Sequence, residues 1–323
     1  MTITRTLTAG LAALTLLVSG TAVHAQAWPS RPIRFIVPYA AGGPTDVIAR
    51  LVAKKLGSDL GQTVVVDNKA GAGGTIGVDA ALKSAPDGYT VALAAPGPLA
   101  GMPHLMKVPY APTDIQYLTV VARIPAVIVV GKDSGITSLA DLIRQAKAAP
   151  GKLNYGSAGP GTTPHIGAEL LKQEAGIDLV HVPYKGAAPA VMALLSGEVQ
   201  MAMVDLLPVL QHVASGALRI LAVASTQRAP QVPDVPTTAE LGHGGVLMDT
   251  TYGVIAPIGL PAVVQTQLRD AVVAAMQSPD MKEQLLRQGA VAATSTPQEY
   301  RALMATEFEK WRSVVARGRI TLP

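Results

Sequence analysis

The residues best suited to chemistry lie in one glycine-rich stretch, from Leu153 to His165. The stretch has the pattern of a short strand, a loop and a helix, with Thr163 as the expected N-cap and Pro164 in the first turn. Unpaired N–H groups, hydroxyls and the positive end of a helix all favour an anion. The pattern fits a carboxylate or phosphate site as well as it fits an ordinary tight turn. The positions that could contact such an anion are Ser157, Gly159, Gly161, Thr162 and His165.

A second strand, glycine-rich loop and helix occurs earlier in the chain. The expected strand is Ile33–Val37, and the loop runs from Pro38 to Thr45, which could cap the next helix. Two such units could direct two helix N-termini at one ligand from opposite sides. The candidate positions here are Tyr39, Ala40, Gly42, Gly43, Thr45 and Asp46.

Several of these polar residues have two readings that the residues alone leave open. Asp46 would complement the helix dipole, or contact ligand or loop N–H groups. His165 would satisfy a loop carbonyl or touch ligand, and Tyr39 would line a cleft or pack in the core. Asp205 follows the apolar strand Val199–Val204, where carboxylates often face a ligand crevice. It would hold an ammonium or hydroxyl group, or cap the next helix. Lys185 fits a surface charge better than an anion partner.

The motifs of several enzyme classes are missing from the sequence. Ser157 has no glycine two residues before it, so the nucleophile elbow of serine hydrolases is not formed. Neither a phosphate-binding P-loop nor a dinucleotide fingerprint is present. The chain has no cysteine, and its histidines lack zinc-ligand spacing. We therefore expect no metal, no cofactor and no catalytic residue.

Composition gives the compartment and excludes some partners. The net charge is +4 without a dense basic block, so nucleic acid is not implied. Residues 1–25 have a positive start, a short apolar run and a small-residue cleavage site before Gln26. This pattern predicts a cleaved signal sequence and export to the periplasm. No later stretch is long enough to span a bilayer.

The remainder of the 323 residues is long enough for two lobes and alternates strand with helix. This alternation predicts an α/β fold with mostly parallel sheets. The expected strands include 63–67, 90–95, 126–130, 179–182, 199–204, 218–224 and 252–256. The expected helices include 75–82, 139–148, 188–196, 207–214, 261–277, 279–288 and a last helix beginning near Pro297.

Eight short motifs occur in order across the chain after the signal sequence. Together they resemble the extracytoplasmic receptors of tripartite tricarboxylate transporters, the Bug-type receptors. The motifs are Trp28–Ile33, Val37–Gly43 with Asp46 and Ala49–Arg50, Gly71–Gly74, Pro86–Tyr89, Gly156–Gly161 with His165, His181–Gly186, Leu218–Val223 and Pro233–Thr237.

The resemblance implies a two-lobed, type II periplasmic-binding-protein fold that closes on a ligand between its lobes. We assign residues 26–126 and 250–323 to the first lobe and residues 127–249 to the second. The implied ligand is a small organic mono- or dicarboxylate, held by Tyr39–Asp46 in one lobe and Ser157–Thr162 in the other. Asp205 would contact its far end. The implied partners are membrane transporter subunits or a sensor protein, and we expect a monomer.

Two stretches depart from the family pattern. Ala94–Pro98, followed by Gly101 and Met102, replaces a more polar loop, and Thr250–Thr251 stand where the family often has tryptophan. Both changes should alter the pocket wall.

The main hypothesis from the sequence is a carboxylate receptor for transport. The alternatives are a ligand receptor for signalling and an exported enzyme that uses Asp205 or His165 as acid or base.

Overall fold

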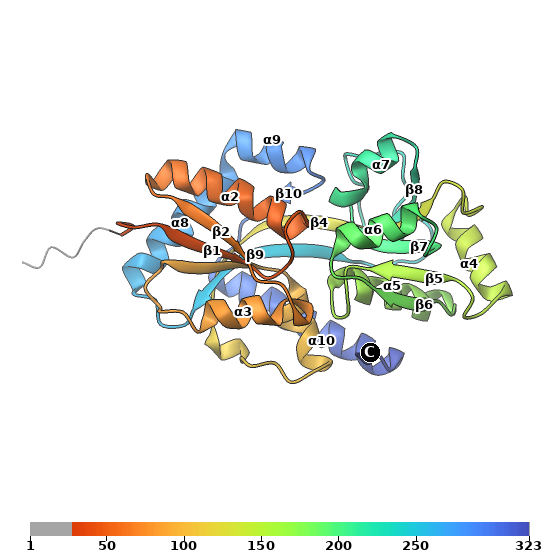
Figure 1. Ribbon diagram of the computed structural model, residues 1–323, viewed down its shortest axis with the longest axis horizontal. Helices are drawn as coiled ribbons and strands as arrows, with labels where there is room; N and C mark the ends of the chain where they lie inside the picture. The colour runs from red at the N-terminus through yellow and green to blue at the C-terminus, as the bar shows by residue number, and fades with distance from the viewer. Residues whose placement is uncertain (1–27, 323) are drawn as a thin grey trace, which may run out of the picture. The chain divides into compact units, whose positions relative to one another are not determined.

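Two groups of strands, each with its own helices, make up the mixed α/β fold of the computed structural model (Figure 1). The structure describes residues 28–322. In the first group, β1 lies between β2 and β3 and is parallel to both, and helices follow the strands. Its elements are β1 (Ile33–Val37), α2 (Pro44–Leu60), β2 (Val64–Asn68), η1 (Ala72–Gly74), α3 (Thr75–Leu82), β3 (Thr90–Ala94), η2 (Gly97–Gly101), η3 (Met102–His104) and η4 (Pro112–Asp114).

The second group repeats this plan. Strand β5 lies between β6 and β7 and is parallel to both. The elements are α4 (Leu139–Ala148), β5 (Asn154–Ser157), α5 (Thr163–Ala175), β6 (Val180–Pro183), α6 (Ala187–Leu195), β7 (Met201–Asp205), η5 (Leu207–Val209), α7 (Leu210–Ala214) and β8 (Leu218–Val223).

Two long strands connect the groups. The first part of β4 (Ile115–Gly131) pairs with β9 (Asp249–Pro257), and its last part pairs with β7 and β8. The remaining elements are α8 (Ala262–Gln277), α9 (Pro279–Arg287), β10 (Val291–Ala292) and α10 (Pro297–Gly318).

The prediction of mostly parallel sheets needs a correction, because the sheet is mixed. Every pairing of β4 and β9 is antiparallel, including those with β3, β7, β8 and β10. The parallel units are confined to the strands that alternate with helices. The long strands instead run between the groups, where no helical crossover intervenes.

Most element positions agree with the sequence prediction to within one or two residues, and the helix starts differ in detail. Helix α5 begins at Thr163 with Thr162 as its N-cap, one residue earlier than expected. Helix α2 begins at Pro44 with Gly43 as its N-cap, so Thr45 does not cap it. The predicted strand 126–130 is the end of the much longer β4.

The C-terminal helix joins the cores of both strand groups. Trp311 and Val314 of α10 belong to the core that surrounds Tyr155 and Ile166. Tyr300 and Met304 of the same helix belong to the core around β3 and β9. A single helix therefore buries apolar side chains in both groups.

All the elements above belong to one compact unit that begins at Arg31. The predicted signal sequence, residues 1–25, lies outside the described residues. Among residues 28–322, no helix combines the length and the apolar character that a membrane crossing requires.

Candidate functional site

The first glycine loop is held in shape by Asp46. One carboxylate oxygen of Asp46 accepts hydrogen bonds from the Gly42 N–H and from Arg50 Nε, both at 2.9 Å. The other accepts from Asn68 Nδ2 at 3.0 Å, and the same Asn68 nitrogen also donates to the Tyr39 carbonyl. Burial alone would raise the pKa of Asp46, but these hydrogen bonds together lower it. Asp46 therefore holds the loop in shape through the Gly42 N–H and through the side chains of Arg50 and Asn68.

The second glycine loop is held by side chains behind it. Ser157 Oγ lies 2.7 Å from His181 Nε2 and accepts the Gly159 N–H. Thr162 Oγ1 donates to the Gly159 carbonyl at 2.8 Å. His165 Nδ1 accepts the Gly161 N–H at 3.2 Å, so this histidine satisfies a loop N–H and not a carbonyl.

The two histidines behind this loop form a buried aromatic stack. The His181 ring lies between His165 and Tyr155, with ring centroids 4.2 Å and 4.7 Å away. Burial, with Lys172 nearby, lowers the pKa of His165 to about 4. Burial, His165 and Lys172 lower the pKa of His181 to about 3, against the opposite influence of Glu169. Both rings are therefore neutral near pH 7 and support the loop by packing and hydrogen bonding.

The glycines of the second loop are required by backbone and packing. Gly161 has φ +65°, and a Cβ on it would lie 2.4 Å from Met102 Sδ. Gly159 has φ +122°, and its Cβ would lie 3.0 Å from the Tyr184 carbonyl. These conformations and contacts exclude side chains without any ligand being present.

A cavity of about 70 Å³ lies where elements of both strand groups meet. The starts of three helices, α2, α5 and α6, line it, and none of the three has a side-chain cap. First-turn N–H groups lack partners within a helix, and each helix start carries partial positive charge. The lining residues are Tyr39, Ala40, Ala41, Gly43, Pro44, Thr45, Ala95, Ala158, Thr162, Thr163, Pro164, Lys185, Gly186, Ala187, Ala188, Pro189, Asp205, Thr250 and Tyr252.

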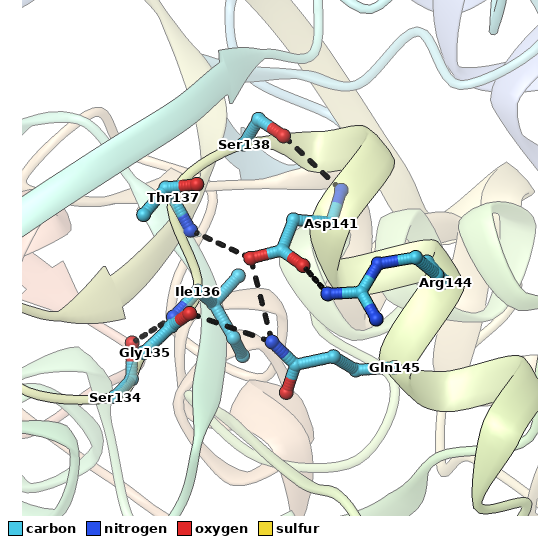
Figure 2. A network of polar contacts seen from close by, with 8 residues as sticks. All are labelled: Ser134, Gly135, Ile136, Thr137, Ser138, Asp141, Arg144 and Gln145. Carbon is cyan, nitrogen blue, oxygen red and sulfur yellow. Dashed lines mark hydrogen bonds and ion pairs between the residues drawn. The ribbon is translucent and has the colours of Figure 1, made fainter.

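Helix α4, far from this cavity in the chain, shows what a satisfied helix start looks like (Figure 2). Ser138 Oγ accepts the Asp141 N–H at 3.1 Å, and the Asp141 carboxylate accepts the Thr137 N–H at 3.1 Å. This side-chain capping uses donors that a ligand could otherwise bind. Asp46 of α2 likewise accepts the Gly42 N–H, but none of the three helix starts at the cavity has a bond from its N-cap side chain like that of Ser138.

Thr163, at the start of α5, is a lining residue of the cavity with a polar atom that has no partner among the described residues. Its side chain is 3% exposed, and its Oγ1 has no hydrogen-bond partner within residues 28–322. A buried hydroxyl without a partner costs free energy, so such groups in native proteins usually serve a ligand or water. Thr163 therefore contributes an unused donor beside the unused N–H groups.

Asp205 brings a carboxylate to the same cavity. Its two oxygens accept hydrogen bonds from Thr250 Oγ1 and Tyr252 Oη, each at 2.6 Å. Burial raises the pKa of Asp205 to about 6, and Asp249 adds to this, while the two hydrogen bonds oppose it. The pKa of Tyr39 is also raised, by burial and then by the charge of Asp205. The cavity thus has an acidic wall as well as positive helix starts.

A second cavity, of about 610 Å³, shares five lining residues with the first, including Tyr39 and Lys185. It is further lined by Gly71–Gly74, Met102 and Gly159. Lys185 is exposed and forms no ion pair with any residue between 28 and 322. It is therefore a free cation where the two cavities adjoin.

The predicted site residues fall into two sets. Six line the first cavity and Gly159 lines the second; the six are Tyr39, Ala40, Gly43, Thr45, Thr162 and Asp205. Five line neither cavity and instead shape the loops from behind: Gly42, Asp46, Ser157, Gly161 and His165. A direct role of any of these residues in binding stays a prediction.

Sequence reasoning missed the start of α6 and Tyr252 of β9, whereas Thr250, expected from the family resemblance to alter the pocket wall, does line the first cavity. The motif His181–Gly186 precedes α6, and Gly186 has φ +126°, so the glycine before a helix was the signal available there. Thr250 and Tyr252 reach the cavity because β9 runs beside β4, a pairing that no local pattern indicates. Asn68 was also missed, because no local pattern indicates its contact with Asp46.

Metal ligation finds no support within residues 28–322, where no group of three or more His, Asp or Glu side chains is arranged to hold an ion. The Ser157–His181 pair resembles part of a catalytic triad, but Ser157 is fully buried and lines neither cavity. The helix starts and the Asp205 carboxylate at the cavity can recognise a ligand by hydrogen bonding and charge.

A two-lobed α/β fold with helix starts suited to an anion at a cavity between its strand groups fits the class of solute-binding proteins. The sequence model of the family described as tripartite tricarboxylate transporter family receptor matches residues 48–319 of this chain. BugT of Bordetella pertussis is 40% identical over 296 residues, which cover 91% of each chain. The chain belongs to this receptor family.

Solved structures agree with this assignment. A protein of R. palustris solved with adipate is 34% identical, with a TM-score of 0.88 over 92% of this chain and 100% of that one. MatC from Rhodopseudomonas palustris, solved with bound malate, is 29% identical, with a TM-score of 0.83 over 89% and 100%.

Proposed function

We propose that this receptor captures a small organic carboxylate in the periplasm and passes it to the membrane subunits of a tripartite tricarboxylate transporter. The carboxylate binds at the first cavity, between the starts of α2, α5 and α6. The observation that carries this proposal is the meeting of three uncapped helix starts beside the unpartnered Thr163 hydroxyl. The adipate and malate bound by related receptors support the same ligand class.

The binding energy comes from replacing water around the carboxylate with fixed donors. A hydrogen bond to a charged group contributes about 1.5–3 kcal/mol. Three or four such bonds, less the cost of association, give affinities in the micromolar range. Lys185 adds attraction for an incoming anion where the cavities adjoin.

The rest of the chain fits this role. The lobes comprise residues 26–126 with 250–323, and residues 127–249, and the change of partner along β4 near Pro125 supports that division. The receptor is a monomer, exported by a signal sequence cleaved between Ala25 and Gln26. It has no catalytic role, which is supported by the burial of Ser157 and by the receptor family to which the chain belongs.

A thermal-shift screen tests the ligand class. The mature protein is stripped of carried-over ligand and heated with C4 to C6 mono- and dicarboxylates, each beside its neutral amide. A true ligand at 100 times its Kd stabilises the fold by about 2.7 kcal/mol. We expect shifts with one or a few related acids and none with their amides. Equal shifts with acid and amide, or no shift with any acid, would contradict the proposal.

A further inference from the structure

The first cavity joins positive helix starts to a buried carboxylate. Asp205 lies at the end of β7, is 6% exposed, and lines the same cavity as the starts of α2, α5 and α6. A ligand that fills this cavity therefore meets two walls of opposite electrostatic character.

The position of the Asp205 carboxylate is fixed by its two partners on β9. Thr250 Oγ1 donates to Oδ1 and Tyr252 Oη donates to Oδ2. Each carboxylate oxygen can accept a further hydrogen bond, because an ionised carboxyl group offers about four acceptor positions. Asp205 is thus held in place and still has capacity for a ligand donor.

The charge of Asp205 is not balanced by a cation. No Lys, Arg or His among residues 28–322 forms an ion pair with it. The nearest titratable influences are acidic or phenolic: Asp249, Tyr39 and Tyr252. The free cation Lys185 is exposed where the cavities adjoin. An ionised ligand carboxylate placed against Asp205 would therefore be repelled by a charge that no cation among residues 28–322 pairs with.

We infer that the receptor selects carboxylates whose far end carries a hydrogen-bond donor, a hydroxyl or ammonium group that Asp205 accepts, over dicarboxylates of equal length. The inference rests on the proposed function, since it assumes that the ligand carboxylate occupies the helix starts. The raised pKa of Asp205 agrees with it, because a bound donor would restore stabilisation that burial removes from the carboxylate.

The test compares ligands that differ only at the far end. Calorimetry at pH 8 measures the Kd of adipate, 6-hydroxyhexanoate and 6-aminohexanoate, and of succinate, 4-hydroxybutyrate and 4-aminobutyrate. We expect the best donor-bearing acid to bind at least about tenfold more tightly than the dicarboxylate of the same length, because like charges in one site cost several kcal/mol. This comparison uses the wild-type chain, so it does not depend on any variant folding.

Two variants assign the preference to Asp205. Asp205→Asn should reduce the preference over the dicarboxylate to less than about threefold. Asp249→Asn is the matched control, because it removes a neighbouring negative charge that does not line the cavity, and it should keep the preference. Melting temperatures of the unliganded variants verify folding.

The outcomes separate the inference from the function on which it rests. Binding of dicarboxylates as tightly as their donor-bearing counterparts would overturn the inference and leave the receptor proposal standing. A preference that survives in Asp205→Asn would also overturn it. Absence of binding by every acid would instead contradict the proposed function.

Discussion

At the scale of single residues, the site depends on which polar atoms are already satisfied. Ser157, Thr162 and Asp46 use their side-chain oxygens on the two glycine loops. Thr163 does not, although its neighbour Thr162 has the same side chain. The two adjacent threonines therefore differ in role: Thr162 shapes the loop, and the Thr163 hydroxyl is free to bind.

Thr163→Val should weaken carboxylate binding by about 10- to 100-fold, because it removes a hydroxyl that contributes about 1.5–3 kcal/mol to a charged group. The unfolding free energy should stay unchanged or rise, since the lost Oγ1 has no partner within the described chain. Calorimetry and urea unfolding measure the two quantities.

Two further variants serve as controls for Thr163→Val. Thr163→Ser keeps the hydroxyl and should bind nearly as the wild type does. Thr162→Val removes the donor to the Gly159 carbonyl and should lower the unfolding free energy by about 1 kcal/mol. Unchanged affinity in Thr163→Val would show that this hydroxyl does not contact ligand.

Sequence predicted the anion-suited loops because glycine, hydroxyl and helix-start signals are local. It could not separate wall residues from supporting residues. Gly161, for example, was a candidate for contact with the anion, but its Cβ direction meets Met102 of η3, which is distant in the sequence. Likewise Thr250 reaches Asp205 only through long-range strand pairing. Such distinctions depend on tertiary contacts that no local pattern contains.

At the scale of elements, helix starts were the most predictable feature and β4 the least. Proline, threonine and glycine mark α5 and α10 closely. The sequence predicted only residues 126–130 of β4, although the strand begins at Ile115 and contains Pro125, a residue that cannot donate to a sheet. The strand continues through Pro125 since its neighbours change at that point from β9 to β7 and β8.

Two buried histidines behind the loop between β5 and α5, His165 of α5 and His181 of β6, should make the fold sensitive to acid. His165 and His181 have folded-state pKa values of about 4 and about 3, below about 6.5 in the unfolded chain. Their contribution is complete above pH 6.5 and declines as pH falls through 4 and 3, because the unfolded state then binds more protons. Asp205, with its pKa raised to about 6, acts in the opposite sense and offsets part of the loss.

Urea unfolding of the wild type and His181→Gln at pH 7, 5.5 and 4.5 measures this effect. The variant should be less stable at pH 7, since it disturbs the ring stack and the contact with Ser157. It should then lose about 2–3 kcal/mol less than the wild type on acidification to pH 4.5. Parallel losses in the two proteins would contradict the assignment of the acid sensitivity to this stack.

At the scale of the whole molecule, α10 connects the two strand groups. Trp311 is fully buried, belongs to the core around Tyr155, and lies against Gly101, where a Cβ would come within 1.8 Å of its ring. One side chain from near the end of the chain thus packs between elements of both groups. The same helix contributes Tyr300 and Met304 to the other core.

Trp311→Ala should lower the unfolding free energy by about 3–5 kcal/mol, the usual cost of removing a buried tryptophan. Arg312→Ala is the neighbouring control: the Arg312 side chain is 67% exposed, so the change should stay within about 0.5 kcal/mol. Denaturant unfolding measures both. Similar small losses in the two variants would contradict the connecting role of Trp311.

The central claim is that a carboxylate is held by the starts of α2, α5 and α6 beside Thr163. The most direct measurement is a crystal structure of the mature protein with the acid that gives the largest thermal shift. We expect a carboxylate oxygen within hydrogen-bond distance of Thr163 Oγ1 and of first-turn N–H groups of α5 or α6. A carboxylate that binds in the second cavity or on Lys185 alone, with Thr163 Oγ1 still unpartnered, would contradict it.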